Sequence, residues 1–134
     1  MQPPEATNNG GPPVFRVLIV EDDEDSREML SELVSLLGHD PIRAANAGEA
    51  LQRVHEAEPE VALIDIGLPE IDGCEVARRV RASGASRVRL VALTGYSDGA
   101  TRETAAAAGF DDFVVKPLLP ETLEELLRRV SSRR

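Results

Sequence analysis

The chain alternates short apolar runs with longer amphipathic stretches from residue 15 onward. The apolar runs predict strands at about 15–20, 41–45, 60–65, 88–94 and 112–115. The stretches between and after them predict helices near 25–37, 47–57, 73–83, 98–108 and 120–131. Residues 17–20, 61–64 and 90–93 are almost wholly apolar, which is typical of parallel strands buried on both faces. Five strands alternating with five helices predict an α/β fold, a three-layer sandwich built around a parallel sheet.

Local signals indicate where the predicted helices begin, end and face the core. A capping residue is followed three positions later by an acid in three pairs: Asp25 and Glu28, Asn46 and Glu49, and Asp72 and Glu75. Gly38 and Gly109 stand where helices are expected to end. Apolar residues at helical spacing predict two core-facing stripes: Met29, Leu30, Leu33, Val34 and Leu37 in the first helix, and Leu123, Leu126, Leu127 and Val130 in the last.

Composition narrows the class of protein. A chain of 134 residues with 42% hydrophobic residues is long enough for one domain with a substantial core. The net charge of −9 argues against binding to nucleic acid or to an anionic membrane, and no apolar stretch is long enough for a membrane span. The single cysteine, Cys74, cannot form an internal disulfide, so we expect a cytoplasmic location. We expect residues 1–13, rich in proline and glycine, to form a disordered leader or linker before a domain at 14–131 and a tail at 132–134.

Four predicted strands end in polar residues whose chemistry is related. They are Glu21, Asp22 and Asp23 after the first strand, Asp65 in the third, Thr94 in the fourth and Lys116, the only lysine of the chain, in the fifth. The carboxyl ends of parallel strands meet at one edge of a sheet, so these groups are expected to converge there. Clustered carboxylates need a cation, and hard oxygen ligands suit Mg²⁺. A metal ion, a lysine and a hydroxyl around one aspartate favour phosphoryl chemistry, with the aspartate as nucleophile.

With these residues in place, the chain resembles the receiver domains of two-component response regulators over about residues 15–131. The resemblance depends on four fragments that occur in order: residues 20–23 (Val-Glu-Asp-Asp), 63–69 (Leu-Ile-Asp-Ile-Gly-Leu-Pro) with Asp72-Gly73, 92–95 (Ala-Leu-Thr-Gly), and Lys116-Pro117. Each fragment is weak evidence alone, whereas all four at these spacings are highly specific. The resemblance implies a flavodoxin-like fold with strand order 2-1-3-4-5.

The resemblance also implies a role for each matching residue. Asp65 would accept a phosphoryl group, Thr94 would form a hydrogen bond with it, and Lys116 would form an ion pair with it. The Lys116–Pro117 peptide bond is expected to be cis. Mg²⁺ would be bound by Glu21, Asp22, Asp65 and the carbonyl of Gly67, and Phe113 would move with Thr94 as the switch. The implied partners are a histidine kinase or histidine phosphotransfer protein as donor, and a protein target at the face formed by the fourth helix, fifth strand and fifth helix. We expect a monomer or a weak dimer.

Some positions depart from the common pattern of this family. Glu21 stands where aspartate is more usual, and Phe113 replaces a tyrosine, so that the switch ring has no hydroxyl. Gly67 and Tyr96 occupy the two positions that tune the rate of dephosphorylation in the family. His39 and His55 are expected on a turn and on a helix away from the acidic edge, so the phosphoryl group is expected to come from another protein or domain.

Three other functions compete with that of a phosphorylation-switched signalling module. A phosphatase with an aspartate nucleophile usually has a second acid two residues later, but that position is Gly67. A nucleotide- or flavin-binding domain needs a glycine-rich loop after the first strand, where the three acids would repel a phosphate. A receiver-like module that binds partners without phosphorylation would not need the complete set of site residues. We therefore expect no enzyme activity beyond Mg²⁺-dependent self-phosphorylation from a donor and slow self-dephosphorylation.

Overall fold

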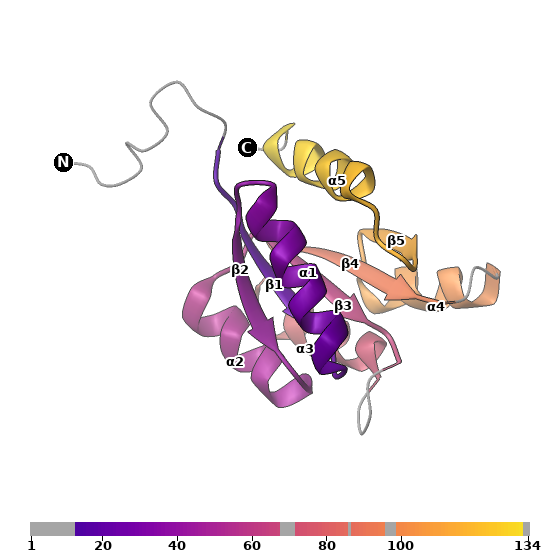
Figure 1. The fold of residues 1–134 in the computed structure, drawn as a ribbon. Coiled ribbons are helices and arrows are strands. Elements are labelled where there is room, and N and C mark those ends of the chain that lie inside the picture. Colours follow the sequence, from indigo (N-terminus) through magenta and orange to yellow (C-terminus); the bar gives the residue numbers. More distant parts are fainter. Residues whose placement is uncertain (1–12, 68–71, 86, 96–98, 133–134) are drawn as a thin grey trace.

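The computed structural model describes residues 13–67, 72–85, 87–95 and 99–132, and five strands alternate with five helices along this part of the chain (Figure 1). The order along the chain is β1 (Arg16–Val20), α1 (Glu24–Leu36), β2 (Asp40–Ala44), α2 (Ala47–Ala57), β3 (Val61–Asp65), α3 (Gly73–Ala82), β4 (Arg89–Thr94), α4 (Gly99–Ala108), β5 (Asp112–Val115) and α5 (Pro120–Ser132). All four neighbouring strand pairs are parallel, and the order across the sheet is β2-β1-β3-β4-β5. The predicted α/β sandwich and its strand order are confirmed.

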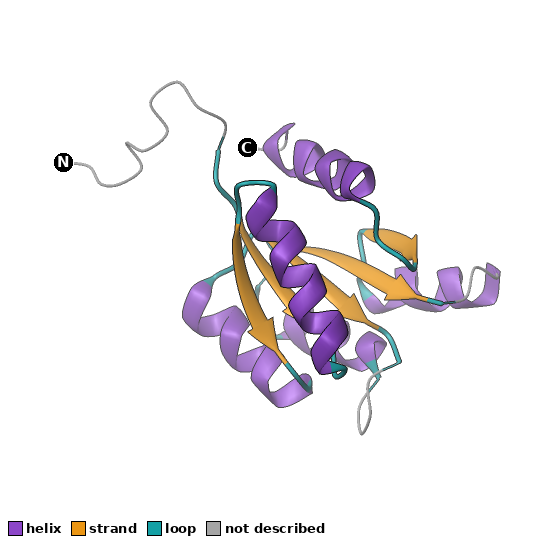
Figure 2. Ribbon diagram, in the orientation of Figure 1, coloured by secondary structure: helices purple, strands orange, loops and turns teal. Residues whose placement is uncertain are grey.

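Helices cover both faces of the sheet, which creates two separate hydrophobic cores (Figure 2). One core joins the sheet to α2, α3 and α4 and contains small aliphatic side chains such as Ala50, Ala77 and Ala105. The other joins the opposite face to α1 and α5 and contains Val34 and Leu123, which are both fully buried. Alternate side chains of a strand point to opposite faces, so the apolar runs of β1, β3 and β4 supply both cores at once.

The helix start signals are confirmed for α2 and α3 and wrong for α1. Asn46 and Asp72 each accept a hydrogen bond from the backbone N–H three residues later, at 2.9 Å in both cases. The cap of α1 is Asp23, whose Oδ2 accepts from the N–H of Ser26 at 2.8 Å, and not Asp25. Asp23 has the extended backbone that a cap requires, whereas Asp25 is already in the first turn of the helix.

The predicted apolar stripe of α1 includes one residue that does not belong to it. Met29 is 65% exposed, whereas Leu30, Leu33 and Leu37 pack against the core around Val34. Leu30, Leu33, Val34 and Leu37 already complete one helical face at spacings of three and four residues, which leaves Met29 at its edge. Gly38 and Gly109 follow α1 and α4 with positive φ angles of 90° and 109°, as expected for helix ends. None of the helices in the described part of the chain combines the length and apolar character that spanning a membrane requires.

Candidate functional site at the carboxyl edge of the sheet

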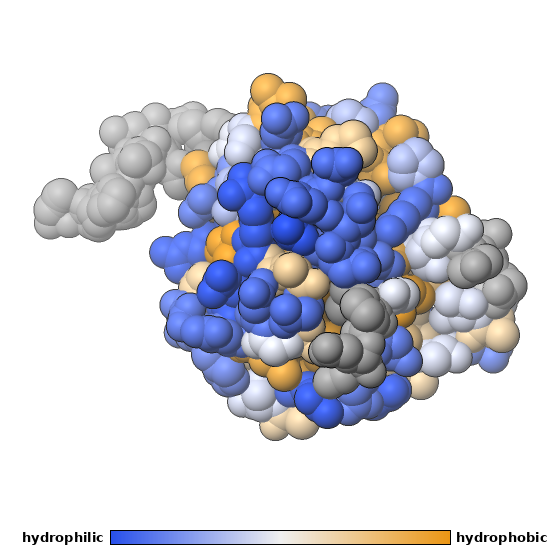
Figure 3. Space-filling model, turned by 60° about the horizontal axis from the view of Figure 1, so that its bottom comes forward, coloured by the Kyte–Doolittle hydropathy of each residue, from blue (hydrophilic) through white to orange (hydrophobic). Residues whose placement is uncertain are grey.

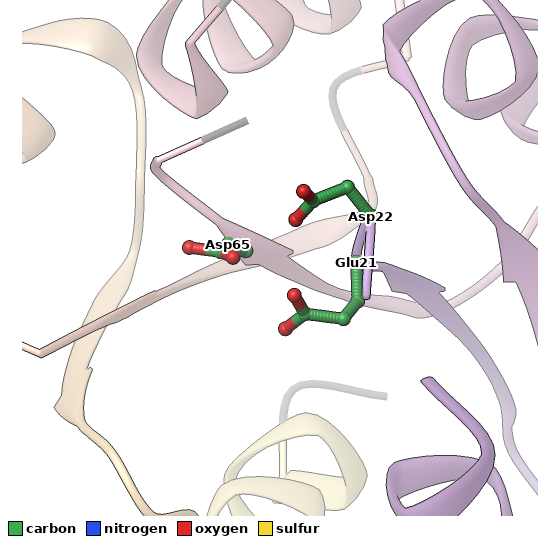
Figure 4. Close-up of side chains that lie close together, drawn as sticks. All are labelled: Glu21, Asp22 and Asp65. Atoms are coloured by element: carbon green, nitrogen blue, oxygen red, sulfur yellow. The ribbon is translucent and has the colours of Figure 1, made fainter. Parts of the chain in front are cut away.

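Three carboxylates converge where β1 and β3 end, at the bottom of the molecule in Figure 1. Glu21 and Asp22 follow β1 directly, and Asp65 is the last residue of β3. Figure 4 shows the three side chains directed toward one shared space, and one oxygen from each lies within 4.8 Å of the others. Glu21 is only 2% exposed, Asp65 is half-buried and Asp22 is exposed, so the cluster extends from the protein interior to its surface.

The β1–α1 connection holds the first two carboxylates in place. The backbone N–H of Glu21 donates to the carbonyl of Ala44 at 3.1 Å, which continues the pairing of β1 with β2 by one residue. Arg27, in the first turns of α1, donates from Nη1 to the carbonyl of Glu21 at 2.9 Å. Asp23 caps α1, so the helix begins only four residues after the end of β1, and Glu21 and Asp22 lie in the short connection between them.

The position of Asp65 depends on a close approach of α3 to β3. The backbone N–H of Gly73 donates to the carbonyl of Ile66 at 3.2 Å. A Cβ atom placed on Gly73 would lie 2.6 Å from the Asp65 carbonyl oxygen and 2.6 Å from Ile66 Cα, so only glycine fits there. The N–H of Gly67 donates to Asp65 Oδ1 at 3.0 Å and orients the carboxylate. The Gly67 carbonyl as a metal ligand stays a prediction.

Lys116 comes from the end of β5 and completes the cluster. Its Nζ lies 3.3 Å from Glu21 Oε1 and 3.3 Å from Asp65 Oδ2. Its backbone N–H donates to the Thr94 carbonyl at 2.7 Å, which ties β5 to β4 at the same level, and the Lys116–Pro117 bond is cis as expected. Burial lowers the pKa of Lys116, but the charges of Asp65 and Glu21 and their hydrogen bonds outweigh that effect and raise it. Lys116 is therefore a fixed cation at neutral pH.

Glu21 is the acid of the cluster whose ionisation is disfavoured by its surroundings. Burial, a hydrogen bond with Asp65 and the negative charge of Asp65 raise the pKa of Glu21 from 4.5 to about 7, although Lys116 acts in the opposite direction. One lysine is thus not enough to offset the burial of Glu21 and its repulsion by Asp65. A divalent cation between these oxygens would relieve that repulsion, and an all-carboxylate donor set open to solvent on one side fits Mg²⁺.

The remaining predicted site residues lie on β4 and β5. Thr94 ends β4 and is 4% exposed, and the role of its hydroxyl in the site stays a prediction. Phe113 is half-buried on β5, and the guanidinium carbon of Arg102 lies 4.6 Å from the centre of its ring. Tyr96 lies outside the described residues. Arg27 and Arg102 could not be recognised from the sequence, and Gly73 appeared there only as part of a motif, because each acts through a contact that only packing reveals.

The edge of the sheet that contains the cluster faces solvent. Figure 3, which brings the bottom of the molecule forward, shows a largely hydrophilic surface there. The cluster reaches this surface through Asp22, which is exposed, and Asp65, which is half-buried.

Comparison with known proteins agrees with this geometry. Residues 17–128 match the family described as the response regulator receiver domain. A probable transcriptional regulator ycf27 of Guillardia theta is 37% identical over 118 residues, which cover 88% of this chain and 46% of that protein. The transcriptional regulatory protein AruR of Pseudomonas aeruginosa is 37% identical over 126 residues, covering 87% of this chain and 51% of that protein. The chain thus spans about half the length of these curated relatives.

Solved structures show the same fold. The chemotaxis protein CheY4 of Vibrio cholerae superimposes with a TM-score of 0.82 at 29% identity, covering 88% of this chain and 99% of that one. A putative response regulator of Chloroflexus aurantiacus gives a TM-score of 0.82 at 30% identity, covering 90% of this chain and 99% of that one. The match to residues 17–128 extends over most of the chain and includes all the predicted site residues. The chain therefore belongs to the response regulator receiver domains, the signalling domains of two-component systems.

Proposed function

We propose that this chain is a phosphorelay receiver that accepts a phosphoryl group from a phosphohistidine donor onto Asp65. The strongest support is the position of Lys116, whose Nζ lies 3.3 Å from Asp65 Oδ2 and 3.3 Å from Glu21 Oε1. A carboxylate nucleophile beside a fixed cation and a group of metal-binding oxygens is suited to phosphoryl transfer. Receiver domains bind Mg²⁺ at an acidic pocket of this kind.

In the proposed reaction, a carboxylate oxygen of Asp65 attacks the phosphorus of the phosphohistidine. The new oxygen–phosphorus bond forms as the phosphorus–nitrogen bond breaks, and the electron pair returns to the imidazole, which takes up a proton. Lys116 is placed to neutralise the charge on the transferred group. The product is an aspartyl phosphate, and the chemistry requires no further cofactor than a divalent cation.

The other site residues have supporting roles in this proposal. Glu21, Asp22, Asp65 and the Gly67 carbonyl would hold Mg²⁺, which would supply positive charge to the phosphoryl oxygens. The Thr94 hydroxyl donates a hydrogen bond to a phosphoryl oxygen. Phosphorylation then shifts the chain between two conformations and changes the face formed by α4, β5 and α5, where a downstream protein binds.

The donor protein is proposed to bind at a groove beside the site. This groove has a volume of about 600 Å³ and lies between α1 and the β5–α5 connection. Its walls are largely apolar and include Met29, Leu33, Leu36 and Leu118, while Glu21 and Lys116 line the same groove. Met29 and Leu36 are 65% and 83% exposed, which is unusual for large apolar side chains on one helix face. A donor helix seated there would bring its phosphohistidine to Asp65.

Intact mass after incubation with acetyl phosphate tests the acceptor. We expect the mass of one phosphoryl group to be added with Mg²⁺, and no addition with EDTA or in Asp65→Asn. Asp25→Asn is the matched control, because Asp25 is an exposed aspartate of α1 outside the cluster. Labelling of Asp65→Asn equal to that of the control would refute the assignment of Asp65.

Two outcomes would favour another function. Continuous release of phosphate from a phosphate monoester would indicate a phosphatase, although Gly67 supplies no second acid after Asp65. The absence of both acetyl phosphate labelling and a beryllofluoride complex would indicate a binding module that acts without phosphorylation. A beryllofluoride complex without detectable labelling would instead indicate a short-lived aspartyl phosphate, because beryllofluoride occupies the phosphoryl position without being hydrolysed.

A further inference from the structure

Arg102 of α4 covers the ring of Phe113 on β5. The guanidinium carbon lies 4.6 Å from the ring centre, within the range at which a cation is attracted to an aromatic face. Arg102 is itself exposed, and it forms one wall of a hollow of about 410 Å³ between α4 and β5 that Phe113, Phe110 and Ala106 also line. The contact therefore covers the exposed side of a half-buried ring whose other side packs against the core.

Little else on α4 holds the Phe113 ring in that position. The sequence of α4 is Gly-Ala-Thr-Arg-Glu-Thr-Ala-Ala-Ala-Ala, and its buried side chains are Ala105 and Ala108. A methyl group offers few contacts to a ring, whereas the planar guanidinium of Arg102 stacks on it. Arg102 is the largest side chain that α4 contributes to the walls of the hollow.

Phe113 lies beside the part of β4 that leads to Thr94. Phe113 pairs in register with Ala92 of β4, and Thr94 lies two residues further along that strand. Ala92 and Thr94 are on the same face of the sheet, because alternate side chains of a strand share a face. Phe113 packs against the core cluster that contains Ala92. The strand neighbour of Phe113 on that face is thus alanine, whose methyl group is a small obstacle to movement of the ring.

We propose that Arg102 is a positioning residue that holds Phe113 outward in the unphosphorylated protein and so sets how readily the domain switches. This inference rests on the proposed function, since the inward position is taken up only when the phosphoryl group draws Thr94 toward Asp65. In this proposal the contact of Arg102 with the ring exists in the outward state and is broken when the ring moves inward. Its loss must therefore raise the inward population and, by linkage, tighten the binding of any ligand that prefers the inward state.

Fluorine NMR on protein labelled with 4-fluorophenylalanine can report the ring directly, because the chain has only three phenylalanines. The Phe113 signal is assigned by its loss in Phe113→Leu. In the wild-type protein, Mg²⁺ with beryllofluoride should move this signal to a second position. In Arg102→Met, which keeps a similar length without the charge, the signal should already lie part of the way there without beryllofluoride.

The affinity for beryllofluoride is the second readout. We expect Arg102→Met to bind it roughly two- to five-fold more tightly than the wild type, the factor that corresponds to an exposed cation–π contact. Arg102→Lys should fall between the two, because it restores the cation without the planar group. Glu103→Gln is the control for a charge change at the neighbouring exposed position of α4, and it should behave like the wild type.

The outcomes separate this inference from the proposed function. If the wild type binds beryllofluoride and its Phe113 signal moves, but Arg102→Met matches the wild type in signal and affinity, Arg102 does not hold the ring. Weaker binding by Arg102→Met would also overturn the inference. If the wild type itself binds no beryllofluoride, the proposed function fails, and the role of Arg102 fails with it.

Discussion

The Lys116 ammonium lies 3.3 Å from the carboxylate of Glu21, although 95 residues separate them along the chain. The contact joins the end of β5 to the end of β1 across the intervening strands β3 and β4. Asp65 of β3 lies at the same 3.3 Å from the Lys116 Nζ. One cation therefore serves two acids, and the raised pKa of Glu21 shows that it does not serve both fully.

The incomplete stabilisation of the Glu21 carboxylate should appear in the pH dependence of stability of the metal-free protein. The pKa of Glu21 is about 7 in the folded protein and its ordinary value is 4.5, so the folded state binds the extra proton between these values. The contribution of Glu21 to the free energy of unfolding is therefore fully present below pH 4.5 and is lost as the pH rises through about 7. Urea unfolding in EDTA should therefore show a loss of about 3 kcal/mol or less from this group over that range.

Glu21→Gln provides the control for that titration, because glutamine keeps the shape of the side chain but has no proton to lose. The difference between the two unfolding curves should grow with pH in EDTA. Added Mg²⁺ should stabilise the wild type more at high pH than at low pH, since the ion binds ionised carboxylates. Parallel wild-type and Glu21→Gln curves in EDTA would show that Glu21 ionises normally.

Gly73→Ala should disturb the acceptor through its backbone. The new Cβ would lie 2.6 Å from the Asp65 carbonyl oxygen, and backbone cannot move aside as a flexible side chain can. We expect a loss of about 1–3 kcal/mol in the free energy of unfolding and slower labelling of Asp65 by acetyl phosphate. Chemical denaturation and intact mass measure the two effects.

The matched control is Gly48→Ala, near the start of α2. The nearest atom to its new Cβ would be Asn46 Oδ1 at 3.5 Å, an ordinary contact, so alanine should be neutral or slightly stabilising in a helix. Equal effects of the two substitutions would contradict the steric explanation for Gly73.

Asp112 should be the most costly ionic residue to remove outside the site. Its side chain is 8% exposed and lies 2.6 Å from Arg89 Nε and 2.8 Å from Arg129 Nη1. Asp112→Ala would leave the largely buried Arg89 without its partner, at a cost of about 3 kcal/mol in the free energy of unfolding. Urea denaturation at neutral pH measures this loss.

Glu75→Ala is the comparison for Asp112→Ala, because Glu75 also pairs with two arginines, Arg78 and Arg79, but at the surface. Solvent screens such pairs, so the change in stability should be much smaller. Similar losses for Asp112→Ala and Glu75→Ala would mean that burial does not determine the strength of these pairs.

Leu36→Glu should separate recognition of a donor protein from chemistry at Asp65. Leu36 is 83% exposed, so stability should change by no more than about 0.5 kcal/mol. Labelling by acetyl phosphate should be unchanged, whereas transfer from a purified phosphorylated histidine phosphotransfer domain should slow. Rapid-quench assays with a panel of such domains measure the transfer rate.

Val14→Glu is the control for a charge placed on an exposed apolar residue, because Val14 is 51% exposed beside the start of β1, at the other end of the sheet. It should leave both reactions unchanged. If Leu36→Glu transfers as fast as Val14→Glu with every donor that phosphorylates the wild type, the groove beside α1 is not the donor site.

The sequence by itself determined the layers of this fold and the location of its acidic site. The apolar runs at 17–20 and 61–64 indicated strands buried on both faces, a pattern typical of parallel strands covered by helices. Parallel strands bring their carboxyl ends to one edge, so the strand ends alone predict that Glu21, Asp65 and Lys116 lie together. These predictions depend only on periodicity and chain direction.

The tertiary structure alone decided which side chains touch. Three features depend on how the helices pack on the sheet. They are the contact of Arg102 with the ring of Phe113, the position of Asp112 between two arginines, and the exposure of Met29. The cap at Asp23 depends on where the chain turns after β1. Contacts between elements are set by rotations and shifts of a few ångströms, and the period of a sequence pattern does not encode them. The ionisation of Glu21 follows from those same distances, because electrostatic interactions depend on separation and burial and not on residue type alone.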